Sequence, residues 1–243
     1  MEVISLTKDR NKSPSLESFS LSILPAKSLE QINTEKYMRA FQLWKSVWEP
    51  TLKKLDGLSQ LFSDGFTRQD FLCLIEYNDT AVGLCCFRSV HLRSEIELED
   101  SWFQPWPKNL LKGLALEYPK ALIPSWLTVH PDYRRSNGYF GPNISQILAE
   151  LIALSCITTS SDIAFGTPRK DLSVTKLVSS AGATTLVENV IHHNVEIDLV
   201  AFFPEKIKNR KFNNETIHLW NRRLDLRQPL IRKEKNYELS DFV

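Results

Sequence analysis

The sequence predicts a mixed α/β protein with a twisted, mostly antiparallel sheet flanked by helices. Some stretches alternate between apolar and polar residues, as strands do, while others repeat their apolar residues at helical spacing. In the middle of the chain, two apolar runs are joined by Asn78-Asp79, which is typical of a hairpin turn. In the second half, apolar runs alternate with helical patterns, which favours helix-connected strands. Hairpins and helix-connected strands together indicate a mixed sheet.

The first half begins with an alternating strand and continues into an aromatic helix. Tyr37, Phe41, Trp44 and Trp48 recur at helical spacing and therefore share one face. Pro50 is expected to end this helix, because proline lacks the N–H that a helix interior needs. The elements predicted here are a strand at 19–25, helices at 33–50 and 51–62, and strands at 71–77 and 81–90.

The second half is organised around a long helix whose apolar residues form one stripe. Pro142 suits the first position of that helix, and Gly182 is expected to stop a later one. The segment 91–120 interrupts the pattern and is treated as an insertion with a short helical stretch. The elements predicted after it are a strand at 122–129, a loop at 133–141, a helix at 142–156, a strand at 163–166, a helix at 173–181, and strands at 184–191 and 194–203.

The chain is predicted to hold one domain with two extensions. We expect a polar amino-terminal arm at 1–18, a folded α/β domain at 19–204 that includes the insertion 91–120, and a basic carboxy-terminal extension at 205–243. Between Lys206 and Lys235, ten basic residues face three acidic ones, a local net charge of +7. Such an asymmetry indicates either an interaction surface for an acidic partner or a solvated extension that docks through Ile217, Leu219 and Trp220.

Composition excludes several classes of protein. The 243 residues carry a formal net charge of +1, so no overall field attracts nucleic acid. No apolar run reaches the 18 or so residues of a membrane span, and the first 20 residues do not resemble a secretion signal. The four cysteines lie in apolar stretches without metal-ligand spacing, which indicates reduced core thiols. We therefore expect a cytoplasmic protein with neither a metal nor a membrane span.

The loop after the strand at 122–129 is a candidate anion site. It is rich in basic residues and glycine, and it leads into a helix, so backbone N–H groups and the helix dipole are expected to converge there. Gly138 and Gly141 are predicted to allow close backbone approach, while Arg134 and Arg135 supply charge for a pyrophosphate. A surface turn with two incidental arginines is the alternative.

This stretch resembles motif A of the GNAT superfamily of N-acetyltransferases. The segment Arg135-Ser-Asn-Gly138 matches the first two positions of that motif, although its third position holds Phe140 and the next glycine follows at 141. The segment 167–182 is similar to the superfamily's strand 5 and helix 4, with Ala183 in place of a phenylalanine, and the order of elements over 19–203 also matches. Pro168-Arg169 further resembles the branch of long-chain N-acyl amino acid synthases and autoinducer synthases.

The resemblance implies a donor site for a pantetheine thioester. The pantetheine would pair with the backbone of Leu127 and Val129, and backbone N–H groups of the same strand would stabilise the oxyanion. The implied donor-binding residues are Leu127, Val129, Arg134, Arg135, Ser136, Asn137, Gly138, Tyr139, Phe140 and Gly141.

The catalytic groups of the superfamily have no full counterpart here. The positions that carry its acid or base hold Ser125, Ile123 and Val178, of which only Ser125 could relay a proton, through water. Candidate substitutes are Glu76 on a neighbouring strand, His130 at the end of the central strand, and His192 and His193 in the last turn. In an extended chain the two adjacent histidines would point to opposite faces and could not share a metal.

Function is therefore expected to be acyl transfer to an amine. The donor would be acetyl-CoA, a longer acyl-CoA or an acyl-carrier protein, and the acceptor a small amine. Trp102, Phe103, Trp106 and Leu110 could wall a tunnel for a long acyl chain or could simply cover the core. Carrier docking would use basic residues of the extension: Arg222, Arg223, Arg227, Arg232 and Lys233. The alternative is a catalytically silent module that keeps the fold for ligand binding or interaction.

Overall fold

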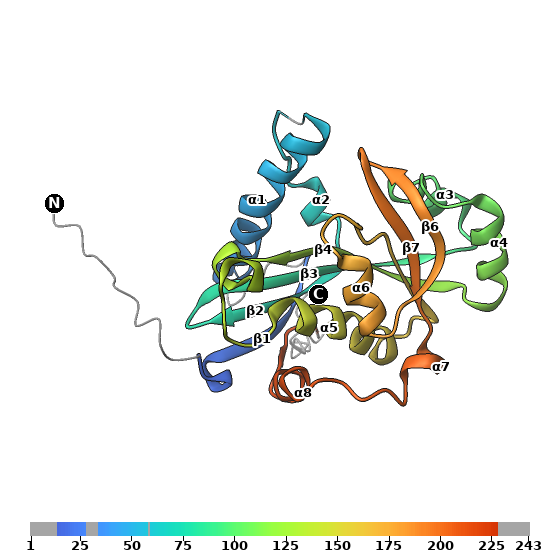
Figure 1. The fold of residues 1–243 in the computed structure, drawn as a ribbon. Coiled ribbons are helices and arrows are strands. Elements are labelled where there is room, and N and C mark those ends of the chain that lie inside the picture. The colour runs from blue at the N-terminus through green and yellow to red at the C-terminus, as the bar shows by residue number, and fades with distance from the viewer. Residues whose placement is uncertain (1–13, 28–33, 58, 228–243) are drawn as a thin grey trace, which may run out of the picture.

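The computed structural model describes residues 14–27, 34–57 and 59–227, and its centre is one eight-stranded sheet (Figure 1). The strand order is β6-β7-β5-β4-β3-β2-β1-β8, with β4–β5 and β1–β8 parallel and the other neighbours antiparallel. This arrangement confirms the mixed, mostly antiparallel sheet. The strands are β1 (Phe19–Pro25), β2 (Phe71–Tyr77), β3 (Thr80–His91), β4 (Lys120–Val129), β5 (Ile163–Gly166), β6 (Thr184–His192), β7 (Val195–Phe202) and β8 (Leu224–Asp225).

Helices cover both faces of the sheet (Figure 1). On one face, α1 packs over β3 and β4, and on the other α5 packs against the same two strands. Most residues of α5 are buried, because it lies between the sheet and the carboxy-terminal elements. The helices are α1 (Thr34–Asp56), α2 (Asp64–Thr67), α3 (Glu95–Leu98), α4 (Lys108–Glu117), α5 (Ile144–Thr158), α6 (Val174–Ser180), α7 (Pro204–Ile207) and α8 (Asn214–Asn221).

Two helix boundaries differ from the predictions. Helix α1 continues through Pro50 to Asp56, and the predicted helix at 51–62 is absent as a separate element of the described chain. Proline removes one hydrogen bond from a helix, but here the aromatic face that docks on the sheet stabilises the turns before it. Pro142 also precedes α5 instead of opening it, because the side chain of Asn143 caps the helix by accepting the N–H of Gln146.

The insertion packs as part of the core. Phe103 and Trp106 are buried in a cluster with residues of β5 and β7, and the Trp106 ring lies 4.9 Å from that of Phe165. Trp102 stacks on Trp106 with ring centroids 5.6 Å apart. This packing matches a segment that covers one end of the sheet.

The segment after Phe203 adds to the same body. Helix α8 packs on α5 and β1 through Leu219 and Trp220, as the docking alternative expected, and β8 extends the sheet beside β1. Residues up to 227 thus contact the sheet layer, and the boundary at 204 stays our proposal for the end of the acyltransferase-like domain. No helix in the described part of the chain is both long and apolar enough to cross a membrane.

Candidate functional site

The central feature of the site is a gap in the sheet between β4 and β5. These parallel strands pair only at Ala121 with Ile163 and at Leu122 with Ala164. Beyond Leu122, no strand among the described residues pairs with that edge of β4. The edge therefore offers backbone donors and acceptors to an extended ligand.

A β-bulge lies within the open part of β4. Ser125 faces Cys86 and Thr128 faces Leu84, so Trp126 and Leu127 together oppose the single residue Cys85. Trp126 has a φ of 56°, which is unusual for a bulky residue. The bulge changes the direction of the β4 backbone in the part of the strand that no longer pairs with β5.

Hydrogen bonds and aromatic rings hold the bulge in place. The indole Nε1 of Trp126 donates to Gly65 O of α2 at 2.9 Å, and Thr128 Oγ1 donates to Trp126 O at 2.6 Å. Trp48 donates to Thr128 Oγ1, and the rings of Trp44 and Trp48 meet that of Trp126 edge-on at 5.4 and 5.0 Å. The aromatic face predicted for α1 thus supports the bulge, a role that helical spacing alone did not reveal.

The loop after β4 consists of two 3-10 turns, Pro131–Tyr133 and Arg135–Asn137. Arg134 folds back and donates to Val129 O at 2.9 Å, while Arg135 donates to Gly141 O at 3.3 Å. Gly138 has a φ of 80°, and a Cβ atom there would meet nothing within 4 Å. The structure therefore brings Arg134, Arg135 and Gly138 together at the end of β4.

Gly141 has a different role from the one predicted. A Cβ atom at this position would lie 2.0 Å from the hydroxyl oxygen of Tyr139, so the glycine makes room for that ring. Among the residues that the structure describes, this hydroxyl has no hydrogen-bond partner, and burial raises its pKa. Close packing against the ring of Tyr139 therefore favours glycine at 141.

Substitution of Gly141 tests this packing. Gly141→Ala is expected to destabilise the protein by about 1–3 kcal/mol, because the tyrosine ring must leave its position. Thermal or denaturant unfolding measures the loss, and a cycle with Tyr139→Ala should recover most of it as coupling energy. Gly113→Ala in α4, where a Cβ meets nothing within 4 Å, is the control and should be neutral or mildly stabilising. Equal losses at 113 and 141 would contradict the assignment.

The amino terminus of α5 adjoins this loop and is already close to a carboxylate. The backbone N–H of Asn143 donates to Glu215 Oε2 of α8 at 3.3 Å. An acidic group at a helix amino terminus is favourable, since it complements the helix dipole. The carboxy-terminal segment therefore contributes directly to the electrostatics of the candidate donor site.

Two of the catalytic candidates lie beside the open part of β4. Ser125 Oγ donates to Gln69 Oε1 at 3.2 Å, and the buried amide of Gln69 donates in turn to Gly65 O at 2.8 Å. His130 Nδ1 accepts the N–H of Asp132, which fixes its ring at the start of the loop. Ile123 and Val178, where the resemblance in sequence led us to look for proton-transfer groups, are buried and apolar.

Glu76 lies farther along the sheet, on β2. It is 1% exposed and pairs with Lys36 and with Arg39 Nε, the latter at 2.8 Å. Two cations of α1 therefore occupy this carboxylate, which makes it an anchor between helix and sheet in the structure described.

His192 and His193 lie at the tip of the β6–β7 hairpin, and the prediction that they point apart is wrong. His193 has a φ of 49° because it belongs to the turn, so the two rings come within 4.1 Å of each other. His193 Nδ1 lies 3.0 Å from Asp56 Oδ2 at the end of α1. Among the described residues, no group of three or more potential metal ligands has suitable geometry.

The hairpin tip also touches α1 through Asn194, whose Nδ2 donates to Leu55 O at 3.1 Å. These contacts join the α1 half of the sheet to the β6–β7 half. The pKa of His192 is lowered, mainly by burial and to a smaller extent by the neighbouring His193. The carboxylate of Asp56 partly offsets this shift by favouring the protonated ring.

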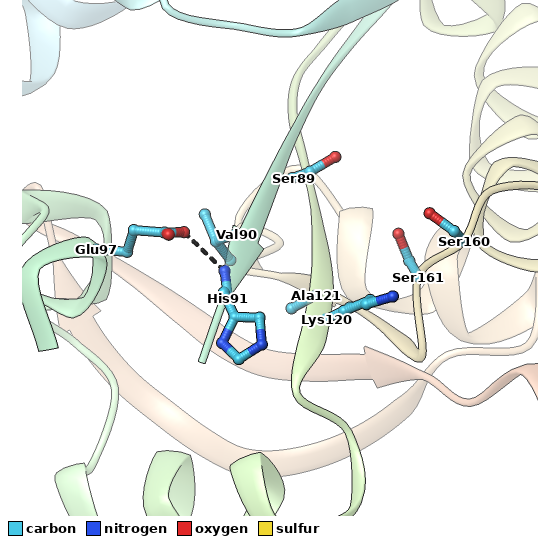
Figure 2. Close-up of a pocket in the computed structure, with 8 residues that line it drawn as sticks. All are labelled: Ser89, Val90, His91, Glu97, Lys120, Ala121, Ser160 and Ser161. Atoms are coloured by element: carbon cyan, nitrogen blue, oxygen red, sulfur yellow. Dashed lines mark hydrogen bonds between the residues drawn. The ribbon is translucent and has the colours of Figure 1, made fainter. Parts of the chain in front are cut away.

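A separate polar pocket of about 280 Å³ lies at the other end of β4, near its first residue (Figure 2). Its lining combines Lys120, His91 and Glu97 with serines from β3 and from the segment after α5. Glu97 accepts the backbone N–H of His91 at 2.7 Å. Because β4 rises about 3.3 Å per residue, its ten residues separate this pocket from the loop by roughly 30 Å.

Comparison with known proteins finds similarity in structure. An N-acyl amino acid synthase from uncultured soil microbes, FeeM, superposes with a TM-score of 0.52 at 10% identity, covering 79% of this chain and 95% of that one. The AHL synthase LasI gives 0.51 at 15% identity, covering 85% of this chain and 96% of that one. No family model matches the sequence, and no curated protein matches it.

Proposed function

We propose that this chain, whose fold is that of the GNAT N-acyltransferases, transfers an acyl group from a pantetheine thioester to an amine. The main observation behind this proposal is the gap between β4 and β5, together with the bulge at Trp126 and the basic loop that follows β4. A pantetheine arm is an extended, amide-containing chain, and the open edge of β4 is complementary to it.

The proposed donor site follows the open edge and then the loop. Leu127 and Val129 would pair with the pantetheine amides, and backbone N–H groups at the bulge would stabilise the oxyanion of the attacked carbonyl. The diphosphate of a CoA donor would lie on the loop from Arg135 to Gly141. The full set proposed for donor binding is Leu127, Val129, Arg134, Arg135, Ser136, Asn137, Gly138, Tyr139, Phe140 and Gly141.

The reaction itself requires little covalent chemistry from the protein. The amine nitrogen attacks the thioester carbonyl carbon, a C–N bond forms, the C–S bond breaks, and the proton lost by nitrogen ends on solvent or on the thiolate. Ser125, hydrogen-bonded to Gln69, supports a proton relay through water, and His130 is the nearest imidazole along the chain. Glu76, His192 and His193 remain weaker proposals because each is held in other contacts.

The second candidate function is a silent module of the same fold. It is favoured by the buried apolar side chains of Ile123 and Val178, which leave two usual proton-transfer positions without a titratable group. A silent module would bind a donor without turning it over.

Donor binding is tested by thermal shift with acetyl-CoA, long-chain acyl-CoA and acyl-carrier protein. A donor at about 100 times its dissociation constant should stabilise the protein by roughly 2.7 kcal/mol. Release of free thiol with a panel of amines then separates the transferase from the silent module. Lack of stabilisation by every donor would exclude both functions.

The same assay decides between CoA and a carrier protein. Arg222 pairs with Glu17, Arg227 pairs with Asp225, and Arg223 lies over the Trp220 ring, so these three arginines already have partners. Arg232 and Lys233 lie outside the described residues. Carrier docking through such exposed charges would weaken strongly with salt, whereas use of a CoA donor without a carrier would be less sensitive.

A further inference from the structure

The accessible part of β4 is short and coincides with the bulge. Ser125, Trp126 and Leu127 are partly exposed, whereas the four residues before them and the two after them are buried. The indole N–H of Trp126 is already bonded to Gly65 O, and Leu127 has an apolar side chain. The hydroxyl of Ser125 is therefore the polar side-chain group that a ligand meets on this stretch.

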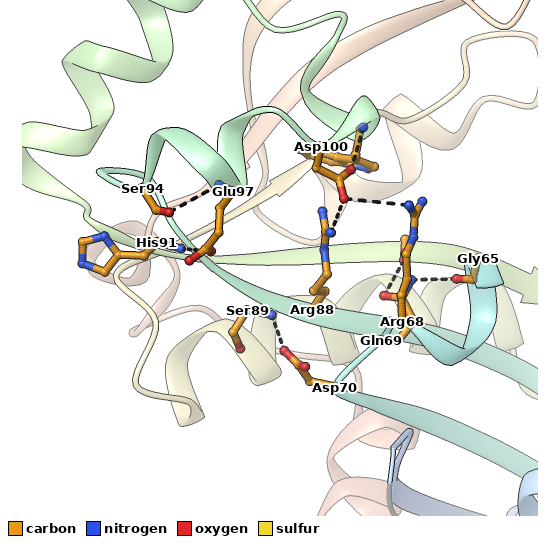
Figure 3. Close-up of polar contacts among 12 residues, drawn as sticks. Gly65, Arg68, Gln69, Asp70, Arg88, Ser89, His91, Ser94, Glu97 and Asp100 are labelled. Carbon is orange, nitrogen blue, oxygen red and sulfur yellow. Dashed lines mark hydrogen bonds and ion pairs between the residues drawn. The ribbon is translucent and has the colours of Figure 1, made fainter.

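A buried glutamine determines the direction of that hydroxyl. Gln69 is 3% exposed, and its Nε2 donates to Gly65 O at 2.8 Å (Figure 3). A backbone carbonyl only accepts hydrogen bonds, so the amide nitrogen has to face Gly65 and the amide oxygen has to face away from it. This oxygen, Oε1, lies 3.2 Å from Ser125 Oγ. Because an amide oxygen is also only an acceptor, the Ser125 hydroxyl has to donate its proton to Gln69.

The consequence is that Ser125 Oγ can only accept a hydrogen bond from a ligand. A serine hydroxyl has one proton and two lone pairs, and the proton is committed to Gln69. Within the described part of the chain, no donor occupies the lone pairs. An amide is not an ionisable side chain, so Gln69 holds this hydrogen bond without taking the proton. The arrangement is suited to a molecule that offers an N–H group.

One carbonyl group on α2 positions both Ser125 and the bulge. Gly65 O accepts hydrogen bonds from Gln69 Nε2 and from Trp126 Nε1, the latter at 2.9 Å. A Cβ atom on Gly65 would lie 3.0 Å from Cζ2 of Trp126, so α2 approaches the bulge closely. Adjacent residues of a strand are about 3.3 Å apart along its axis. A nitrogen held by Ser125 would therefore lie next to the carbonyl that we place at the bulge.

We propose that Gln69 is a positioning residue: by holding the Ser125 proton, it makes Ser125 Oγ accept an N–H of the acceptor amine and so aims the nitrogen lone pair at the thioester carbonyl. This assignment rests on the proposed acyl transfer and says how the acceptor of that reaction is held. The C–N bond forms and the C–S bond breaks as described above. No proton passes to Ser125, and the proton lost by nitrogen still ends on solvent or on the thiolate.

A double-variant cycle tests the proposal, with phenethylamine, benzylamine and butylamine as acceptors and a saturating donor. Gln69→Met keeps the side-chain length and removes both polar groups, while Gly65 O keeps Trp126 as its donor, so the variant is expected to fold. Gln69→Met and Ser125→Ala should each lower kcat/KM for the amine by about three- to ten-fold, the usual range for one hydrogen bond.

The double variant should lose no more than Ser125→Ala alone, because Gln69 acts through Ser125. Losses that multiply in the double variant would overturn the proposal. Thr67→Val is the control, since Thr67 lies in the same short helix and its hydroxyl donates to Ser63 O. It should leave kcat/KM unchanged.

The pH profile of Gln69→Glu gives a readout that a packing role would not give. When protonated, the introduced carboxyl can donate to Gly65 O and still accept the Ser125 proton, as the amide does. When ionised, it has no proton to donate to Gly65 O. Burial raises the pKa of a carboxyl, so kcat/KM relative to the wild type should be highest at acid pH and fall as the pH rises through that raised pKa. A constant ratio between about pH 5 and 8, with the variant folded throughout, would contradict the proposal.

Side-chain amide NMR without donor separates this proposal from the proposed function. The Gln69 amide signals, assigned by their loss in Gln69→Met, should shift when one of the three amines is added to the wild type, and should not shift in Ser125→Ala. If they shift but no donor releases thiol, the positioning role stands and acyl transfer fails. If thiol release occurs and is insensitive to Gln69→Met and Ser125→Ala, acyl transfer stands and the positioning role is overturned. The absence of both responses would overturn both.

Discussion

Deletion of Trp126 is expected to lower kcat by about 10²–10³, the usual effect of losing an oxyanion donor. The deletion leaves Ser125 opposite Cys86 and Thr128 opposite Leu84, as they are now, and places Leu127 alone opposite Cys85. The bulge disappears while the rest of the register stays. Steady-state kinetics with a saturating donor measures the loss, because saturation separates kcat from any change in donor affinity that the altered backbone of Leu127 causes.

Trp126→Gly is the matched control for this deletion. Both variants lose the indole and its contacts with Trp44 and Trp48, but glycine keeps the extra residue and tolerates the positive φ. The glycine variant is therefore expected to be less stable and to retain most of its kcat. If the two variants have the same kcat, the bulge has no catalytic role.

Glu76→Ala is expected to destabilise the protein by about 3–5 kcal/mol, because removal of one partner from a buried ion pair leaves the other charges uncompensated. The carboxylate is 1% exposed, whereas Lys36 and Arg39 are about a quarter exposed, so hydration relieves part of the loss. Denaturant unfolding at neutral pH measures it.

Two controls accompany this substitution. Glu35→Ala removes a carboxylate that lies 3.9 Å from Arg39 but is 92% exposed, and it should cost less than about 1 kcal/mol. The triple variant Glu76→Met, Lys36→Met, Arg39→Leu replaces the whole cluster with apolar side chains and should recover much of the stability. If Glu76→Ala unfolds like Glu35→Ala, the cluster does not anchor α1.

The sequence by itself determined the order of strands β1 to β7 and of helices α1, α5 and α6, the mixed sheet, the hairpin at Asn78-Asp79 and the basic loop at the end of β4. These follow from local rules: the period of apolar residues gives the element type, and turn residues give the breaks between elements. The same rules failed at Pro50, where docking of an aromatic face outweighs the loss of one hydrogen bond.

Only the tertiary structure decided how the site is built. No local pattern marks Trp126 as a bulge, because most of the partners that hold it, Gly65, Trp44 and Trp48, lie far away in the sequence. Gly141 fits a ligand-binding loop in sequence, yet the ring of Tyr139 requires it. In the sequence, Glu76 and Arg68 are both single charged residues with no visible partner. In the described part of the fold, the buried carboxylate of Glu76 pairs with two cations, whereas the more exposed guanidinium of Arg68 keeps unused N–H donors. Partners that are distant along the chain determine whether a charged side chain is buried and paired, so the role of that side chain depends on the fold.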